Sequence, residues 1–229
     1  DRNIAVNVSI DETPIREEGF AAGREYGRTE AQDAFWDAYQ ENGTRTDYER
    51  AFRGPWWNAV SYQPKYPIKP VNAGYMYQYS EIEGRVEIDT SACTNMDALF
   101  GISKKITSIG TIDTRLISRL AGVFGYMTNL QNIDLLILKE DGSQTYTVTC
   151  FEGDPNLKEI RIQGVIGNSL DMKQCYRLSK ESITSIVNAL SGDVSGMALT
   201  LSQFVKKYLT EDEWTALLGT KQNWTISFA

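Results

Sequence analysis

The chain has 229 residues, of which 41% are hydrophobic and 23% charged, a composition that suits one or two folded domains rather than a disordered chain. Its formal net charge is −7, and Lys and Arg are scattered, so nucleic-acid binding is disfavoured because an acidic surface repels phosphates. The sequence has no histidine, which excludes Ser-His-Asp and Cys-His catalysis and removes the commonest ligand of catalytic zinc.

No segment is apolar enough to cross a membrane. The longest uninterrupted apolar run is the tetrad 135–138, whereas a membrane span needs about 20 such residues. The first residue is Asp1 rather than Met, so we expect a processed or trimmed product whose export signal is already gone.

The three cysteines, Cys93, Cys150 and Cys175, contain no CxxC pair. We expect them to be small buried hydrophobic side chains, and the alternative is one disulfide with a spare thiol.

Residues 1–42 predict an N-terminal strand followed by a helical arm. Thr13 as N-cap and Pro14 at the first helical position predict a helix start, and Asn42 with Gly43 predicts the helix end. The strand has no local partner, so the arm is expected to dock elsewhere or to form a homo-oligomer. The alternating apolar residues of the strand are Ile4, Val6, Val8 and Ile10.

Residues 43–71 form an aromatic and proline-rich segment that predicts extended, turn-rich structure. Two interpretations stay open. The segment is either a plug that caps the hydrophobic end of the following repeats, or a ligand surface, since Trp and Tyr are favoured in recognition sites. The candidate binding residues here are Trp56, Trp57, Tyr62 and Tyr66.

Residues 72–177 contain about four repeats. The first anchor column is Met76, Phe100, Phe124 and Phe151, with spacings of 24, 24 and 27. The second, six residues later, is Ile82, Ile106, Leu130 and Leu157. The first unit is degenerate, because Arg85 stands where Ile109 and Ile133 are apolar, and the three extra residues of the third unit fall around 140–143.

Repeats of this length cannot bury their own apolar face and must stack on neighbours. We therefore predict an α/β repeat solenoid, a right-handed stack of leucine-rich-repeat coils, behind the helical N-terminal arm. The segments 109–112, 134–138 and 159–163 are the expected strands, and Phe100, Phe124 and Phe151 are expected to stack inside as a ladder.

The pattern of a Phe, then Leu or Ile six residues later, then Ile, resembles the BspA-type leucine-rich repeat proteins of gut and oral bacteria and their phages. The phrases FWDAYQENGTRTDYERAF, 35–52, and QNWTISF, 222–228, are similar to segments that flank such repeats. The resemblance covers roughly residues 31–229. It implies a surface-exposed adhesin or partner-binding module with no catalytic residues. The family's frequent Cys, three residues after the Phe, is replaced here by Ser103, Met127 and Asp154.

Residues 178–229 predict an α/β C-terminal cap. One helix is expected from Ser179 as N-cap to Gly192, and a second follows the capping box of Thr210 and Glu213 and closes at Gly219. Strands are expected at 197–201 and 224–228.

No residue set predicts catalysis, a metal site or a cofactor. The acidic clusters 11–12, 17–18 and 211–213 are better explained as helix-start residues than as a carboxylate pair.

We therefore predict a non-enzymatic binding module, extracellular or on a bacterial cell surface, that recognises a protein or glycan. Tyr126, beside the repeats, joins the four aromatic candidates. The alternative is a structural component of a phage tail or virion in which residues 1–42 dock or oligomerise. An enzyme is the least favoured class.

Overall fold

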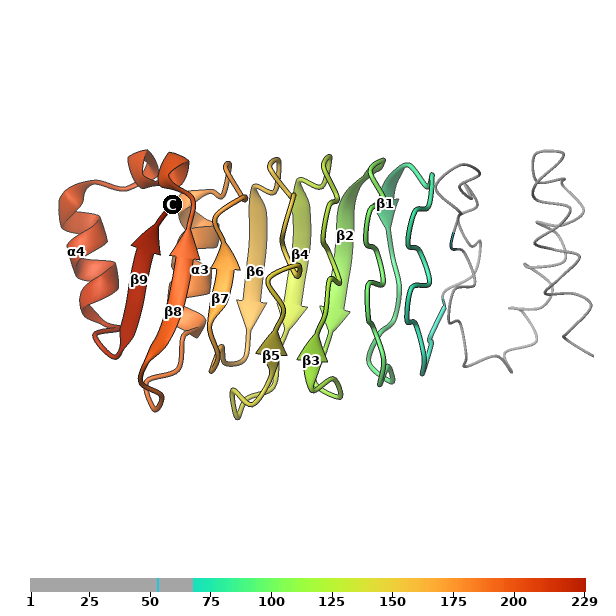
Figure 1. The fold of residues 1–229 in the computed structure, drawn as a ribbon, viewed down its shortest axis with the longest axis horizontal. Helices are drawn as coiled ribbons and strands as arrows, with labels where there is room; N and C mark the ends of the chain where they lie inside the picture. Colours follow the sequence, from blue (N-terminus) through green and yellow to red (C-terminus); the bar gives the residue numbers. More distant parts are fainter. Residues whose placement is uncertain (1–52, 54–67) are drawn as a thin grey trace, which may run out of the picture.

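The computed structural model describes residue 53 and residues 68–229. The predicted N-terminal strand and arm, 1–42, and most of the aromatic segment lie outside this part of the chain. The described residues form short parallel strands that follow one another along the long axis of the molecule, and their helices gather at the C-terminal end (Figure 1).

The largest sheet has four parallel strands in the order β1-β2-β4-β6. Its register places one buried apolar residue from each unit side by side, with Val86 on Ile109, Ile109 on Ile133 and Ile133 on Ile160. Each neighbour therefore covers the apolar side of the next. The strands are β1 (Gly84–Val86), β2 (Ile106–Asp113), β4 (Asn132–Ile137) and β6 (Glu159–Gln163).

Two smaller parallel sheets accompany it, one of the order β3-β5 and one of the order β7-β8-β9. The predicted strands at 197–201 and 224–228 are confirmed as β8 and β9. The strands are β3 (Arg119–Leu120), β5 (Thr145–Tyr146), β7 (Leu170–Met172), β8 (Met197–Leu201) and β9 (Trp224–Phe228). The helical elements are α3 (Lys180–Ala189), the 3₁₀ helix η1 (Gln203–Tyr208) and α4 (Glu211–Gly219).

The core holds a column of stacked aromatic rings. Phe100 lies 6.2 Å from Phe124, and Phe124 lies 5.2 Å from Phe151, which confirms the predicted ladder. The first unit contributes Tyr77, 5.6 Å from Phe100, whereas the anchor column found in the sequence has Met76 in this unit. The first unit runs 23 residues behind the second, both at the bridge of Asn72 with Asn95 and at the pair of Arg85 with Ser108, so Tyr77 lies opposite Phe100.

The predicted α/β leucine-rich-repeat solenoid is wrong as a class, because the described residues form parallel sheets with few helices. Residues 68–178 contain strands and turns but no α-helix. Left-handed backbone explains this in physical terms, since residues with positive φ occur as a pair four residues apart in each of the first three units and cannot continue a right-handed helix. The six positions are Tyr75 and Tyr79, Ala98 and Ile102, and Gly122 and Tyr126.

Two of the three extra residues of the third unit lie between β4 and β5. The pairing of Asp113 with Ile137 has an offset of 24, and the pairing of Arg119 with Thr145 has an offset of 26. The turn around 140–143 was predicted to house them. The buried side chain of Gln144 fastens this loop, because its amide nitrogen donates to Thr114 O at 2.7 Å and its oxygen accepts from the Lys139 N–H at 2.9 Å.

Side chains three residues after two of the core rings, Phe100 and Phe151, accept backbone N–H groups from the preceding unit. Ser103 Oγ accepts from the Ser80 N–H at 3.2 Å, and Asp154 Oδ1 accepts from the Met127 N–H at 2.8 Å. Asp154 is fully buried, and desolvation raises its pKa to about 8, against the smaller opposing effect of that hydrogen bond. This carboxyl group is therefore mostly protonated at pH 7.

The three cysteines are free and buried, as predicted, so the alternative of a disulfide is wrong. Burial raises the pKa of both Cys150 and Cys175, which keeps these thiols protonated and unreactive.

Helix α3 covers the open edge of β6 with serine hydroxyls. Ser182 Oγ accepts from the Ile160 N–H and Ser185 Oγ accepts from the Ile162 N–H, each at 2.9 Å. The N-cap at Ser179 is confirmed, but the helix ends at Ala189 rather than at Gly192. The two serines thus occupy the place of the next strand's carbonyl groups, and they satisfy donors that an open edge would leave unpaired.

Helix α4 begins at the predicted capping box, since the side chain of Thr210 accepts from the Glu213 N–H and the side chain of Glu213 accepts from the Thr210 N–H. Its end is later than predicted, because Gly219 is the last helical residue and Thr220 is the C-cap.

We predict that Phe124→Ala lowers the free energy of unfolding by about 3–5 kcal/mol, because it leaves a cavity between two stacked rings. Leu116→Ala is the control, since Leu116 is 56% exposed. Urea unfolding followed by circular dichroism measures both. A loss below about 1 kcal/mol for Phe124→Ala would contradict the role given to the ladder.

We predict that Asp154→Asn becomes progressively more stable than the wild type as pH rises from 5 to 8. The unfolded Asp ionises near its ordinary pKa of 3.8, whereas the folded one stays protonated until about 8, so wild-type stability falls across this window. The expected slope of the difference is up to about 1.4 kcal/mol per pH unit. Urea unfolding of both proteins at pH 5, 6, 7 and 8 measures it, and a pH-independent difference would refute the assignment.

Candidate functional site

The outward side of the β1-β2-β4-β6 sheet carries polar side chains in register. Alternate residues of a strand point to opposite sides, so the positions that flank the buried column face outward. Arg85 pairs with Ser108, Ser108 with Asn132, and Asn132 with Glu159. We name this surface the polar face, and it consists of Arg85, Glu87, Ser108, Asn132, Asp134, Glu159 and Arg161.

Arg85 connects three strands of the polar face. Its Nε donates to Glu87 at 2.6 Å, its Nη1 donates to Ser108 Oγ at 3.0 Å, and its Nη2 forms an ion pair with Asp134 on β4. The glycine at 110 makes room for this crossing, since a Cβ there would lie 1.9 Å from a Glu87 carboxylate oxygen.

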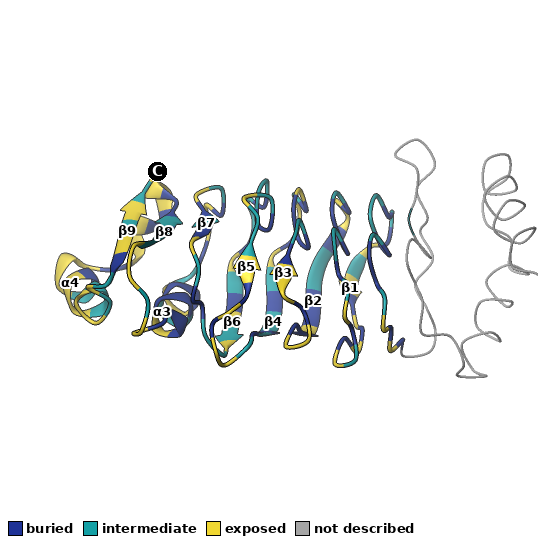
Figure 2. Ribbon diagram, turned by 60° about the horizontal axis from the view of Figure 1, so that its bottom comes forward, coloured by how far each residue is buried: buried dark blue, intermediate teal, exposed yellow. Residues whose placement is uncertain are grey.

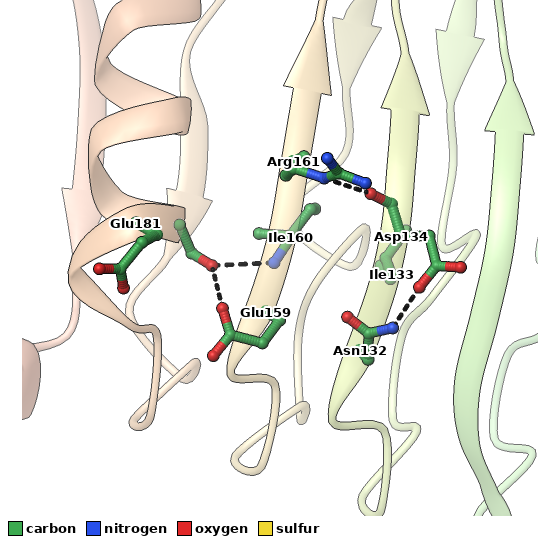
Figure 3. A pocket seen from close by; sticks show the side chains of 8 residues that line it. Asn132, Ile133, Asp134, Glu159, Ile160, Arg161 and Glu181 are labelled. Carbon is green, nitrogen blue, oxygen red and sulfur yellow. Dashed lines mark hydrogen bonds between the residues drawn. The ribbon is translucent and has the colours of Figure 1, made fainter.

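A hollow of about 160 Å³ lies between β4, β6 and the start of α3 (Figure 3). Arg161 lies along one side of it, with its Nε donating to the Asp134 carbonyl at 3.1 Å. Glu159 lies on the other side and accepts from Ser179 Oγ at 2.7 Å. The lining residues are Asn132, Ile133, Asp134, Glu159, Ile160, Arg161, Glu181 and Ser182.

Asp134 is held as an ionised carboxylate within the polar face. The hydrogen bond from Arg85 is the main reason that the pKa of Asp134 lies below its ordinary value, so this carboxylate stays ionised at neutral pH. A general acid or base works best when its pKa is near the operating pH. For a carboxyl group this requires a raised pKa, whereas the pKa of Asp134 is lowered.

The four predicted aromatic residues, Trp56, Trp57, Tyr62 and Tyr66, lie outside the described residues. Within their segment, Arg53 is described, and its guanidinium carbon lies 5.7 Å from the ring centre of Tyr75 and 5.8 Å from that of Tyr79. These distances are in the range of cation–π contacts. Arg53 thus contacts two of the left-handed turn residues of the first unit.

Tyr126, the fifth predicted residue, is 41% exposed at a left-handed turn. A side-chain hydrogen bond with Glu152 is the main reason that the pKa of Tyr126 is raised. Glu152 lines a second hollow of about 180 Å³, together with Val148, Phe151, Asp171, Lys173 and Gln174. Tyr126 therefore stands next to a hollow, but not the one on the polar face.

Sequence reasoning missed the polar face because it aligned Arg85 with Ile109 and Ile133. The structure aligns Val86 with those residues instead, so the first unit is not degenerate at this position. A shift of the alignment by one residue, from Met76 to Tyr77, was the signal that would have placed Arg85 in an outward column.

Among residues 53 and 68–229, no three His, Cys, Asp or Glu side chains are grouped as metal ligands would be. No helix in this part of the chain is both long and apolar enough to span a membrane. Comparisons with protein-family models, curated proteins and solved structures give no match.

We predict that Arg85→Met raises the pKa of Asp134, because it removes the main donor to that carboxylate. The free energy of unfolding is expected to change by less than about 1 kcal/mol, since exposed ion pairs contribute little. Titration of the Asp134 carboxyl carbon by ¹³C NMR measures the first effect. Arg119→Met, on the separate β3-β5 sheet, is the control, and an unchanged Asp134 pKa in Arg85→Met would contradict the network.

Proposed function

We propose that this chain is a non-enzymatic binding protein that uses the polar face to recognise a ligand on a cell surface. The observation that carries the proposal is a set of charges of both signs, fixed by mutual hydrogen bonds across four strands around a shallow hollow. A surface whose side chains are already held in place loses less conformational entropy on binding.

A protein partner fits this face better than a glycan does. The four strands contain no aromatic residue, and Arg85, Asp134 and Arg161 offer alternating charges that suit a complementary protein surface. The glycan alternative is better supported at Tyr126, where an exposed ring adjoins acidic and amide groups.

The resemblance to BspA-type proteins rests on the sequence motifs and supports the same proposal, with a place on a bacterial surface. The alternative, a structural component of a phage tail or virion, depends on residues 1–42, which lie outside the described residues.

We predict that a protein and glycan array probed with the full chain identifies a binder whose affinity falls at least about tenfold in Arg161→Ala, equivalent to about 1.4 kcal/mol. Arg161 is exposed and lines the hollow. The matched control is Arg119→Ala, which removes the same exposed charge from another sheet. Surface plasmon resonance measures the affinities. An array without a binder, or equal losses in both variants, would refute the proposal.

A further inference from the structure

Among the described residues, strand β9 is the edge strand of the β7-β8-β9 sheet, and no other strand pairs with its outer side. The backbone groups of Ala229 point toward the β8 side of the sheet. Its N–H donates to Leu201 O at 3.0 Å, and its carbonyl accepts from the Gln203 N–H at 2.9 Å. Alternate residues of a parallel strand direct their backbone groups to the same side. Ile226 and Phe228 therefore direct their N–H and C=O groups away from β8, where no described residue bonds to them.

The edge of β6 differs from the edge of β9, because a helix covers its backbone N–H groups. There, Ser182 and Ser185 of α3 accept the edge N–H groups. Strand β9 has no such cover among the described residues. It also lacks the devices that prevent edge pairing, since the sequence Trp-Thr-Ile-Ser-Phe has no charge and no proline, and its register with β8 has no bulge.

The inner side of β9 is also incompletely buried. Leu199 and Leu201 on β8 are 0% exposed, whereas their register partners Ile226 and Phe228 are only half-buried. Figure 2 shows intermediate and exposed colours along β9. Phe228 contacts the Trp214 ring of α4 at 5.0 Å, so helix packing covers part of this end. Both backbone and apolar side chains at this end would be covered by one more strand.

The sequence of β9 is nearly symmetric about Ile226. Aromatic residues stand two positions away on either side, and hydroxyl residues stand one position away. In an antiparallel pair centred on Ile226, Trp224 would face Phe228 of a second copy, and Thr225 would face Ser227. Aromatic pairs and Thr–Ser pairs are favourable across strands.

We propose that β9 pairs antiparallel with β9 of a second copy, about a two-fold axis at Ile226, to form a homodimer with one continuous six-stranded sheet. Such an interface is isologous, which is the commonest arrangement in soluble oligomers. The Ile226 residues of the two copies exchange both backbone hydrogen bonds at the centre.

Light scattering on the full chain tests the oligomeric state, with twice the 25.8 kDa chain mass expected at about 50 μM. Ile226→Pro removes an outward N–H without touching a bond to β8, so a folded monomer is expected; circular dichroism checks the fold. A wild-type monomer at every concentration, or a folded Ile226→Pro dimer, overturns the proposal.

Disulfide trapping tests the register independently of that variant. Two-fold pairing puts the two residues at 226 about 5.5 Å apart at Cα, within disulfide range, and those at 227 beyond about 7 Å. Ile226→Cys should therefore cross-link under mild oxidation and Ser227→Cys should not, while the native cysteines are buried. Equal trapping at both positions, or faster trapping at 227, refutes the two-fold register.

Discussion

The structure depends on one constraint, which is that no unit of this chain can shield its own apolar side. The ring of Phe124 is buried because Phe100 and Phe151 lie on either side of it. The same holds for the backbone, where the Ser80 N–H needs Ser103 of the next unit. Side-chain burial and hydrogen bonding therefore both connect each unit to its neighbours. The residues of the polar face are in register because the core residues between them are in register.

Periodicity carried much of the fold prediction. The ladder of Phe100, Phe124 and Phe151 followed from spacing alone, because a repeated apolar residue marks the same place in each unit. The N-caps at Ser179 and Thr210 were also predictable, since capping is a local interaction. These features depend on few residues that are near in sequence or strictly repeated.

The fold class was not predictable in the same way. Repeat length suggested an α/β leucine-rich-repeat class, but the backbone at Tyr79, Ile102 and Tyr126 is left-handed, and these residue types do not predict a positive φ. The polar face was not predicted for a related reason. A shift of the alignment by one residue in the first unit exchanges the residues that point inward with those that point outward. The sequence contains Arg85, but it did not predict that this side chain points outward from the sheet.

The serine hydroxyls of α3 set the width of the polar face. Once Ser182 and Ser185 occupy the edge of β6, no fifth strand can join that sheet on this side, although β8 and β9 continue the stack elsewhere. Growth of the polar face by duplication is thus restricted to whole units inserted ahead of the helix. Such an insertion would add new outward positions while the closing helix stayed unchanged, so the extent of the polar face and the termination of the sheet are separable in this architecture.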